Sequence, residues 1–193
     1  MAGRSRTLIR VCACTSPRPS PSSRRVDLAL TYRYTNLADP TPSGVESLVL
    51  GVDPLVAVLR DDHPAARAGG SPVELRELAD SEWITAPAHT ACGTAVLHAC
   101  RSAGFTPRVR HTCTDFTAMI ALTASCGLPV VLPRMAADRL PPGLVVRPVA
   151  DPALARTIEV AVRRGATHEP PVAACLEAVR ALVLAADGGA PHA

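Results

Sequence analysis

Apolar residues occur in short runs separated by polar turns, a pattern that is typical of alternating strands and helices. Val26–Leu30 predicts a strand that leads into polar residues. Ser47–Leu59 predicts two strands around a bend, because Gly51 and Pro54 interrupt the run. Five further runs have the composition of strands, namely Trp83–Thr85, Arg108–Cys113, Pro129–Leu132, Leu144–Val149 and Arg156–Arg163.

Helix starts are marked by residues that cap the first free N–H groups of a helix. Ser71-Pro-Val-Glu74 has the pattern of a capping box and predicts a helix over Val73–Ala79. Thr90 and Asp115 are typical N-cap residues. They predict two more helices, one over Ala91–Ala103 and one ending near Ser125.

The last predicted helix begins at Pro170, and its apolar face carries Val172, Leu176, Val179 and Val183. Strands therefore alternate with helices along the chain. This order predicts an α/β fold with a mostly parallel sheet.

Residues 1–25 differ in composition from the rest of the chain. They contain six Arg, no acidic residue, and three Pro among Ser residues. Such a segment buries little apolar surface, so we expect a disordered Arg/Pro/Ser-rich tail over 1–25, and a second tail over 186–193.

The chain has a net charge of +3, from 20 basic and 17 acidic residues, but the tail supplies six of the positive charges. From residue 26 onward, 14 Arg stand against 17 acidic residues, a balance of −3. Aromatic residues make up 3% of the chain. An acidic surface with few aromatic rings disfavours nucleic-acid binding, so we expect no DNA binding by this chain alone.

The lengths of the apolar runs and the number of cysteines bear on membrane association and on the redox state of the thiols. No uncharged apolar run reaches the ~18 residues that a transmembrane helix needs, so no membrane association is expected. Seven Cys residues, an odd number, lie mainly in apolar segments. This usage favours reduced thiols and a cytoplasmic location over a disulfide framework.

Sequence motifs for enzymatic chemistry are weak. The chain contains no glycine-rich phosphate loop, GxSxG or HExxH motif, and we expect no cofactor. One alternative is a metal-dependent enzyme that uses His89, Cys92, His111 and Cys113 as ligands. A second is a thiol redox sensor at Cys92, because the first turn of a helix stabilises a thiolate.

A ligand site at the ends of strands is the stronger hypothesis. In open α/β sheets, ligands bind beyond the carboxyl ends of strands and face helix N-termini. Three strand ends carry polar residues, at Thr31–Arg33, at Thr85–Thr90 and at Asp115–Thr117. Hydroxyls, free N–H groups and an Arg side chain would suit a small carboxylate.

Five stretches, in order and spacing, resemble the effector-binding domain of LysR-type transcriptional regulators. They are VDLAL, PLVAVLRDDHPAA, LRELADSEWI, ACRSAGFTPRV and DFTAMIALTASCGLPVVLPRMA. The resemblance covers about residues 26–185. It implies a two-lobed fold similar to type II periplasmic binding proteins, with a small effector between the lobes.

The resemblance also implies a domain organisation and a site. Residues 26–60 and 147–185 would form a partial first lobe, and residues 61–146 the second lobe. The first lobe is expected to be incomplete and to leave the strand at Val26–Leu30 as an unpaired edge. By position, the effector-binding residues would be Thr31, Tyr32, Arg33, Thr90, Asp115, Phe116 and Thr117.

The expected function is therefore that of a regulatory effector-binding domain, not an enzyme, truncated so that the helix-turn-helix is missing. Its expected ligand is a small polar or carboxylate metabolite, and the resemblance allows a homodimer. An alternative is a free-standing solute-binding protein of the same fold.

Overall fold

The computed structural model describes residues 11–13, 27–38, 43–67, 71–150 and 154–187. The chain forms two compact units. Unit 1 consists of Met1–Arg33, Asp39–Gly51 and Thr157–Ala193, and unit 2 of Tyr34–Ala38 and Val52–Arg156. Three strands therefore contribute residues to both units. The lobe boundaries predicted at residues 60 and 147 stay predictions.

The sheet of unit 1 has the strand order β1–β2–β8–β3. These strands are β1 (Val11–Ala13), β2 (Leu28–Tyr34), β8 (Ala155–Arg163) and β3 (Val45–Arg60). Strand β1 runs parallel to β2 and places Val11 opposite Leu28. The prediction of an unpaired edge at this strand is therefore wrong, because β1 and β8 flank β2.

The prediction of disordered tails is wrong at residues 11–13, which form β1, and at residues 186–187, which belong to the last helix. Three residues in a Pro- and Arg-rich segment carry no periodic signal of a strand. The rest of the predicted tails, 1–10, 14–25 and 188–193, lies outside the described residues.

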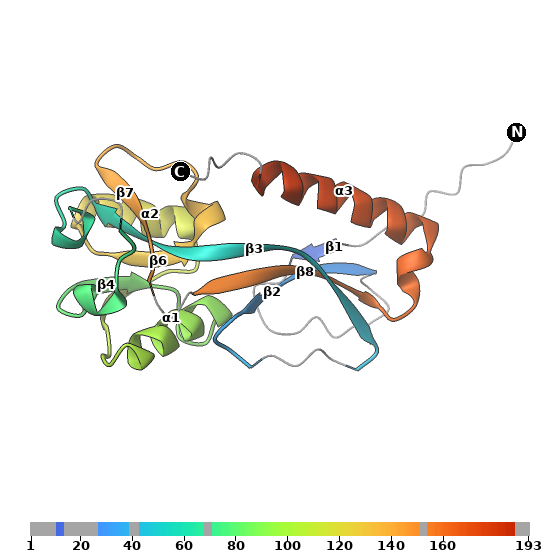
Figure 1. Ribbon diagram of the computed structural model, residues 1–193, viewed down its shortest axis with the longest axis horizontal. Helices are drawn as coiled ribbons and strands as arrows, with labels where there is room; N and C mark the ends of the chain where they lie inside the picture. The colour runs from blue at the N-terminus through green and yellow to red at the C-terminus, as the bar shows by residue number, and fades with distance from the viewer. Residues whose placement is uncertain (1–10, 14–26, 39–42, 68–70, 151–153, 188–193) are drawn as a thin grey trace, which may run out of the picture. The chain divides into compact units, whose positions relative to one another are not determined.

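Helix α3 (Pro170–Asp187) covers one face of the unit 1 sheet, as Figure 1 shows. Val172 and Leu176 pack there against Leu28 of β2 and against Val160 and Val162 of β8. These two helix positions belong to the predicted apolar face of the last helix. Their burial confirms these two positions of the face, because residues four apart lie on one side of a helix. Val179 is half-buried against the same cluster, and the side chain of Val183 lies outside the described residues.

The sheet of unit 2 joins the second half of β3 to three short strands, in the order β3–β6–β4–β5. They are β6 (Val130–Pro133), β4 (Glu82–Thr85) and β5 (Arg108–Thr112), and β7 (Leu144–Pro148) also pairs with β3. Strand β3 is antiparallel to β6 and β7, whereas β4 is parallel to β5 and β6. The predicted α/β class is confirmed.

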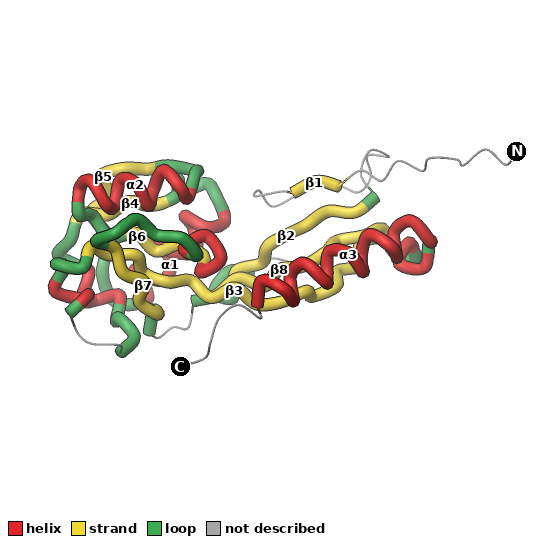
Figure 2. Tube along the Cα trace, turned by 90° about the horizontal axis from the view of Figure 1, so that it is seen from above, coloured by secondary structure: helices red, strands yellow, loops and turns green. Residues whose placement is uncertain are grey.

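Two helices complete unit 2, α1 (Ala91–Ser102) and α2 (Phe116–Cys126), and Figure 2 shows them beside the strands. Both begin directly after the predicted caps Thr90 and Asp115. The core of unit 2 is centred on Trp83, whose indole N–H donates to the Leu78 carbonyl at 3.0 Å. Short 3₁₀ turns connect the elements: η1 (Pro64–Ala66), η2 (Leu75–Leu78) and η3 (Arg134–Ala137) in unit 2, and η4 (Ala166–His168) in unit 1.

Two local predictions are wrong. The run Ser47–Leu59 is one continuous strand, β3, because pairing with β6 begins only at Leu55 and so does not need the N–H that Pro54 lacks. The helix predicted over Val73–Ala79 is only the 3₁₀ turn η2. Its capping box is formed by Glu74 and Glu77, not by Ser71 and Glu74.

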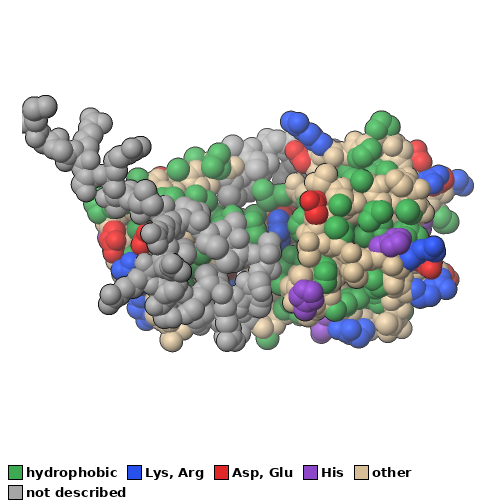
Figure 3. All heavy atoms as spheres, turned by 180° about the vertical axis from the view of Figure 1, so that it is seen from behind, with side chains coloured by type: hydrophobic (Ala, Val, Ile, Leu, Met, Phe, Trp, Pro, Cys, Tyr) green, Lys and Arg blue, Asp and Glu red, His purple; other side chains and the backbone are tan. Residues whose placement is uncertain are grey.

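The surface is mixed in charge. Figure 3 shows acidic and basic side chains interspersed among apolar ones on one face of the described residues. Arg110 and Glu82, for example, form an exposed ion pair with an N–O distance of 2.7 Å. None of the helices in the described segments is long and apolar enough to cross a membrane.

Candidate functional site

The carboxyl ends of β4 and β5 lie side by side in unit 2. The two strands are parallel, and the Cys113 N–H donates to the Thr85 carbonyl at 3.1 Å just where both strands end. The chain continues from each end into a helix, α1 or α2. One sheet edge of unit 2 therefore carries the two N-termini that the sequence predicted.

The Thr90 hydroxyl acts as both hydrogen-bond acceptor and hydrogen-bond donor at the start of α1. Its Oγ1 accepts from the Gly93 N–H at 3.1 Å and donates to the Pro87 carbonyl at 2.7 Å. A Cβ at Gly93 would lie 2.3 Å from the Pro87 carbonyl oxygen and 2.4 Å from that of Ala86. The carbonyl groups of the loop before α1 thus lie in close contact with the first turn of the helix. Only glycine fits at position 93 without displacing this loop.

Asp115 caps α2 in a similar way. Its Oδ1 accepts from the N–H groups of Thr117 at 2.7 Å and Ala118 at 3.1 Å. The carboxylate is therefore occupied by the helix. The neighbouring Thr117 is exposed, and its hydroxyl makes no hydrogen bond to the described part of the chain. Phe116 is half-buried and packs against the core of unit 2.

Thr85 is a residue that sequence reasoning noted only as part of a polar strand end. Its side chain is at the end of β4, and the residue is 3% exposed. Its hydroxyl has no hydrogen-bond partner among the described residues. A buried hydroxyl without a partner costs about 1–3 kcal/mol, so a bound ligand or water would stabilise this position.

In unit 1, the predicted residues Thr31, Tyr32 and Arg33 are consecutive on β2. The Thr31 hydroxyl donates to the Glu159 carbonyl of β8 at 3.4 Å. Arg33 forms an ion pair with the Glu159 carboxylate, whose side chain is 6% exposed. The positive charge of Arg33 is thus already balanced by a buried carboxylate.

The seven predicted residues fall into two groups. The structure brings Thr31–Arg33 together on one strand of unit 1. It places Thr90 and Asp115–Thr117 at the starts of α1 and α2, which follow the adjacent ends of β4 and β5 in unit 2.

The thiol of Cys92 is not in the environment that the redox-sensor hypothesis requires. Cys92 is buried in the first turn of α1, and burial raises the pKa of its thiol. A hydrogen bond from Tyr34 and the charge of Arg156 lower the pKa but do not reverse the shift. A reactive thiol needs a lowered pKa and access to solvent, and the Cys92 thiol has neither in this structure.

The four residues predicted as metal ligands do not come together as a metal site among the described residues. His89, Cys92, His111 and Cys113 all belong to the described residues, and these contain no group of three or more His, Cys, Asp or Glu placed to hold a metal ion. His111 and Cys113 lie on or next to β5, whereas Cys92 is buried in α1.

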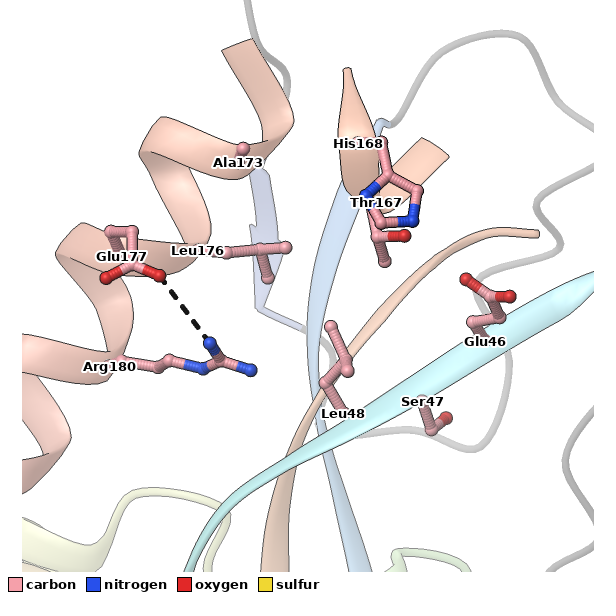
Figure 4. Close-up of a pocket in the computed structure, with 9 residues that line it drawn as sticks. All are labelled: Glu46, Ser47, Leu48, Thr167, His168, Ala173, Leu176, Glu177 and Arg180. Carbon is pink, nitrogen blue, oxygen red and sulfur yellow. Dashed lines mark ion pairs between the residues drawn. The ribbon is translucent and has the colours of Figure 1, made fainter. Parts of the chain in front are cut away.

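A pocket of about 520 Å³ lies in unit 1 between α3 and β3, as Figure 4 shows. Its lining includes two acidic residues, Glu46 and Glu177, and Arg180 pairs with Glu177 at 3.5 Å. None of its lining residues is among the predicted effector residues. The pocket is therefore formed by residues other than those that the sequence predicts for the effector.

Comparison with known families gives one match over most of the chain. The family described as "LysR substrate binding domain" matches residues 14–183. No curated protein matches the chain.

Solved structures show the same fold. The C-terminal domain of a probable LysR family transcriptional regulator from Rhodococcus sp. RHA1 is 22% identical with a TM-score of 0.66, over 89% of this chain and 97% of that one. The BenM effector-binding domain with its effector benzoate is 18% identical with a TM-score of 0.68, over 86% of this chain and 72% of that one. These likenesses confirm the predicted two-lobed fold similar to periplasmic binding proteins.

One solved structure with the same fold belongs to a longer protein. A probable transcriptional regulator from Pseudomonas aeruginosa is 22% identical with a TM-score of 0.63, over 81% of this chain but only 49% of that one. The chain thus spans about half the length of this regulator.

Proposed function

The chain belongs to the LysR substrate-binding domain family, and from this premise we propose that it binds a small carboxylate metabolite as its effector. The observation that carries the proposal is the common edge of β4 and β5, from which α1 and α2 both begin. Helix N-termini favour anions, because the helix dipole and the N–H groups that are not taken by the caps both point at the ligand.

Individual residues of this edge have separate roles in the proposal. Thr90 and Asp115 organise the helix starts, since their side chains are occupied by capping. Thr117 and Thr85 offer hydroxyls that have no partner among the described residues. Phe116 offers a flat apolar surface for an aromatic or aliphatic ligand body.

The unit 1 residues Thr31, Tyr32 and Arg33 are proposed as the second group of effector-binding residues, as the family resemblance implies. Arg33 would interact with a carboxylate while remaining paired with Glu159, so we expect it to contribute less than an unpaired arginine would.

The chemical class of the ligand is supported by a solved member of the family. The BenM effector-binding domain was solved with benzoate, an aromatic carboxylate. We propose the same class, a small aromatic or aliphatic carboxylate, for this chain.

Titration calorimetry with a panel of such acids, benzoate included, tests the proposal. For the acid that binds most tightly, Thr117→Val is expected to weaken binding by about 1–2 kcal/mol, the scale of one hydrogen bond to a charged group. Thr167→Val, in the unit 1 pocket, is the matched control and should leave the affinity unchanged. The proposal fails if no acid binds, or if only the Thr167 variant loses affinity.

The wider role follows from the family. We propose that the domain is the cytoplasmic, effector-sensing part of a regulator without enzymatic activity, and that it forms a homodimer. The structural relatives are transcriptional regulators, which supports this role. Light scattering of the purified chain tests the assembly, and a monomer at all concentrations would contradict it.

A further inference from the structure

The loop between β4 and α1, residues 86–90, directs its carbonyl groups at the first turn of α1. The Pro87 carbonyl accepts from the Thr90 N–H at 2.9 Å and from the Thr90 hydroxyl at 2.7 Å. The carbonyl oxygens of Ala86 and Pro87 also lie so close to Gly93 that a Cβ there would be 2.4 and 2.3 Å from them. The start of the helix thus fixes the first two carbonyl groups of the loop.

The next carbonyl group, that of Ala88, is held by Thr94. The Thr94 hydroxyl lies 2.9 Å from the Ala88 carbonyl oxygen and 2.8 Å from that of Thr90. A hydroxyl has one proton, so these two acceptors share it. The contact with Thr90, four positions back, is common for threonine in a helix. The contact with Ala88 is different, because it joins the helix to the loop before it.

These contacts determine where the N–H groups of the loop point. In a planar trans peptide, the N–H points in the direction opposite to the carbonyl of the preceding residue. The Pro87 carbonyl faces Thr90, so the N–H of Ala88 points away from the first turn of α1. The Ala88 carbonyl faces Thr94, so the N–H of His89 does the same. Both residues are exposed, and neither N–H donates a hydrogen bond within the part of the chain that the structure describes.

We infer that Thr94 is a positioning residue of the effector site, and that by holding the Ala88 carbonyl it presents the N–H groups of Ala88 and His89 to the carboxylate of the effector. The inference rests on the proposed function, since it adds two donors to the same helix start. Free backbone N–H groups in turns are a common means of binding anions. Thr94 itself touches no ligand atom in this arrangement, because its hydroxyl is occupied by the two carbonyl groups.

Nuclear magnetic resonance relaxation of the ¹⁵N-labelled chain tests the positioning role without any ligand. Thr94→Val removes the hydroxyl and keeps the branched shape, whereas Thr94→Ser keeps the hydroxyl. The heteronuclear NOE of the Ala88 and His89 amides is expected to fall in Thr94→Val and to stay unchanged in Thr94→Ser. The amides of residues 95–102 should keep their values in both variants, because the rest of α1 does not depend on this contact.

Ser125→Ala is the matched control. The Ser125 hydroxyl donates to the Ala121 carbonyl at 2.9 Å, which is the same contact four positions back, in α2 and without an attached loop. Its removal should leave the NOE of the Ala88 and His89 amides unchanged.

The donor role is tested by adding the tightest-binding acid of the panel. The amide protons of Ala88 and His89 should shift downfield in the unaltered protein, because an N–H that becomes bonded to a carboxylate is deshielded. Thr94→Val is expected to weaken binding of the acid about tenfold, the scale of a hydrogen bond to a charged group, and Thr94→Ser to restore it.

An unchanged NOE in Thr94→Val, or an equal fall in Thr94→Ser, would overturn the positioning role. Binding of the acid without a downfield shift of the Ala88 and His89 amides would overturn their role as donors. Failure of every acid to bind would instead refute the proposed function, and the relaxation measurement would still decide whether Thr94 holds the loop.

Discussion

Gly93 shows how a single residue constrains the proposed site. A methyl group at this position would lie 2.3 Å from the Pro87 carbonyl oxygen, so the backbone of the loop would have to move. We therefore expect Gly93→Ala to destabilise the protein by more than about 2 kcal/mol, within the range of overpacked cores. Urea denaturation gives the change in the free energy of unfolding.

Gly44→Ala is the comparison for Gly93→Ala. Gly44 has φ +83° but no heavy atom within 4 Å of an added Cβ. The Gly44→Ala change should lower the free energy of unfolding by only about 1–2 kcal/mol, which is the cost of a left-handed conformation for alanine. A smaller loss at Gly93 than at Gly44 would mean that the loop before α1 yields easily.

Buried thiols make the stability of the protein sensitive to alkaline pH. Burial raises the pKa of Cys92, and it raises the pKa of Cys100 from 9.0 to about 12. A group whose pKa is higher in the folded state binds its proton more tightly there than in the unfolded chain. Its contribution is complete below the unfolded pKa and is lost as the pH rises toward the folded one.

The contribution of the buried thiols to the free energy of unfolding is accordingly expected to be complete below pH 9 and to be lost between pH 9 and pH 12. Urea titrations at a series of pH values measure this. Cys100→Ala should flatten the decline. An unchanged decline in this variant would show that Cys100 is not its cause.

At the scale of elements, capping by Asp115 defines the start of α2. Its Oδ1 accepts hydrogen bonds from two N–H groups of the first turn. Asp115→Ala is expected to lower the free energy of unfolding by about 1 kcal/mol, the typical value of an N-cap. Asp138→Ala, at an exposed aspartate after η3, should change it little, and equal effects of the two changes would contradict the capping role.

Elements whose boundaries depend on neighbouring residues could be predicted from sequence. The caps Thr90 and Asp115 act on N–H groups two or three positions away, so their signal is local. The continuity of β3 through Pro54 depends on where β6 pairs with it, and no local pattern records that.

The same distinction explains which side-chain contacts could not be predicted from the sequence. Asp53 and Arg156 are 103 positions apart, and each alone looks like an ordinary charged residue of a strand. Their pairing exists only because β3 and β8 both pass into unit 2. The free hydroxyl of Thr85 likewise becomes visible only when its surroundings are known.

At the scale of the whole molecule, the two units differ in their cores. Unit 2 buries a large cluster around Trp83, Leu59 and Leu132, whereas the cluster of unit 1 is small and centred on Leu28 and Val160. Hydrophobic burial is the main source of stability. Native-state hydrogen exchange is therefore expected to be slower for the amides of β4 and β6 than for those of β2. The reverse order would show that cluster size does not set local stability here.

The central claim is that a carboxylate binds where α1 and α2 begin. Nuclear magnetic resonance of the ¹⁵N-labelled chain, titrated with the tightest-binding acid of the panel, tests it most directly. The account predicts saturable shifts of the backbone amides at 85–93 and 113–118, with those of the unit 1 pocket residues Glu46–Leu48 and Thr167–His168 unchanged. Shifts confined to the pocket residues, or no saturable shift with any acid, would contradict it.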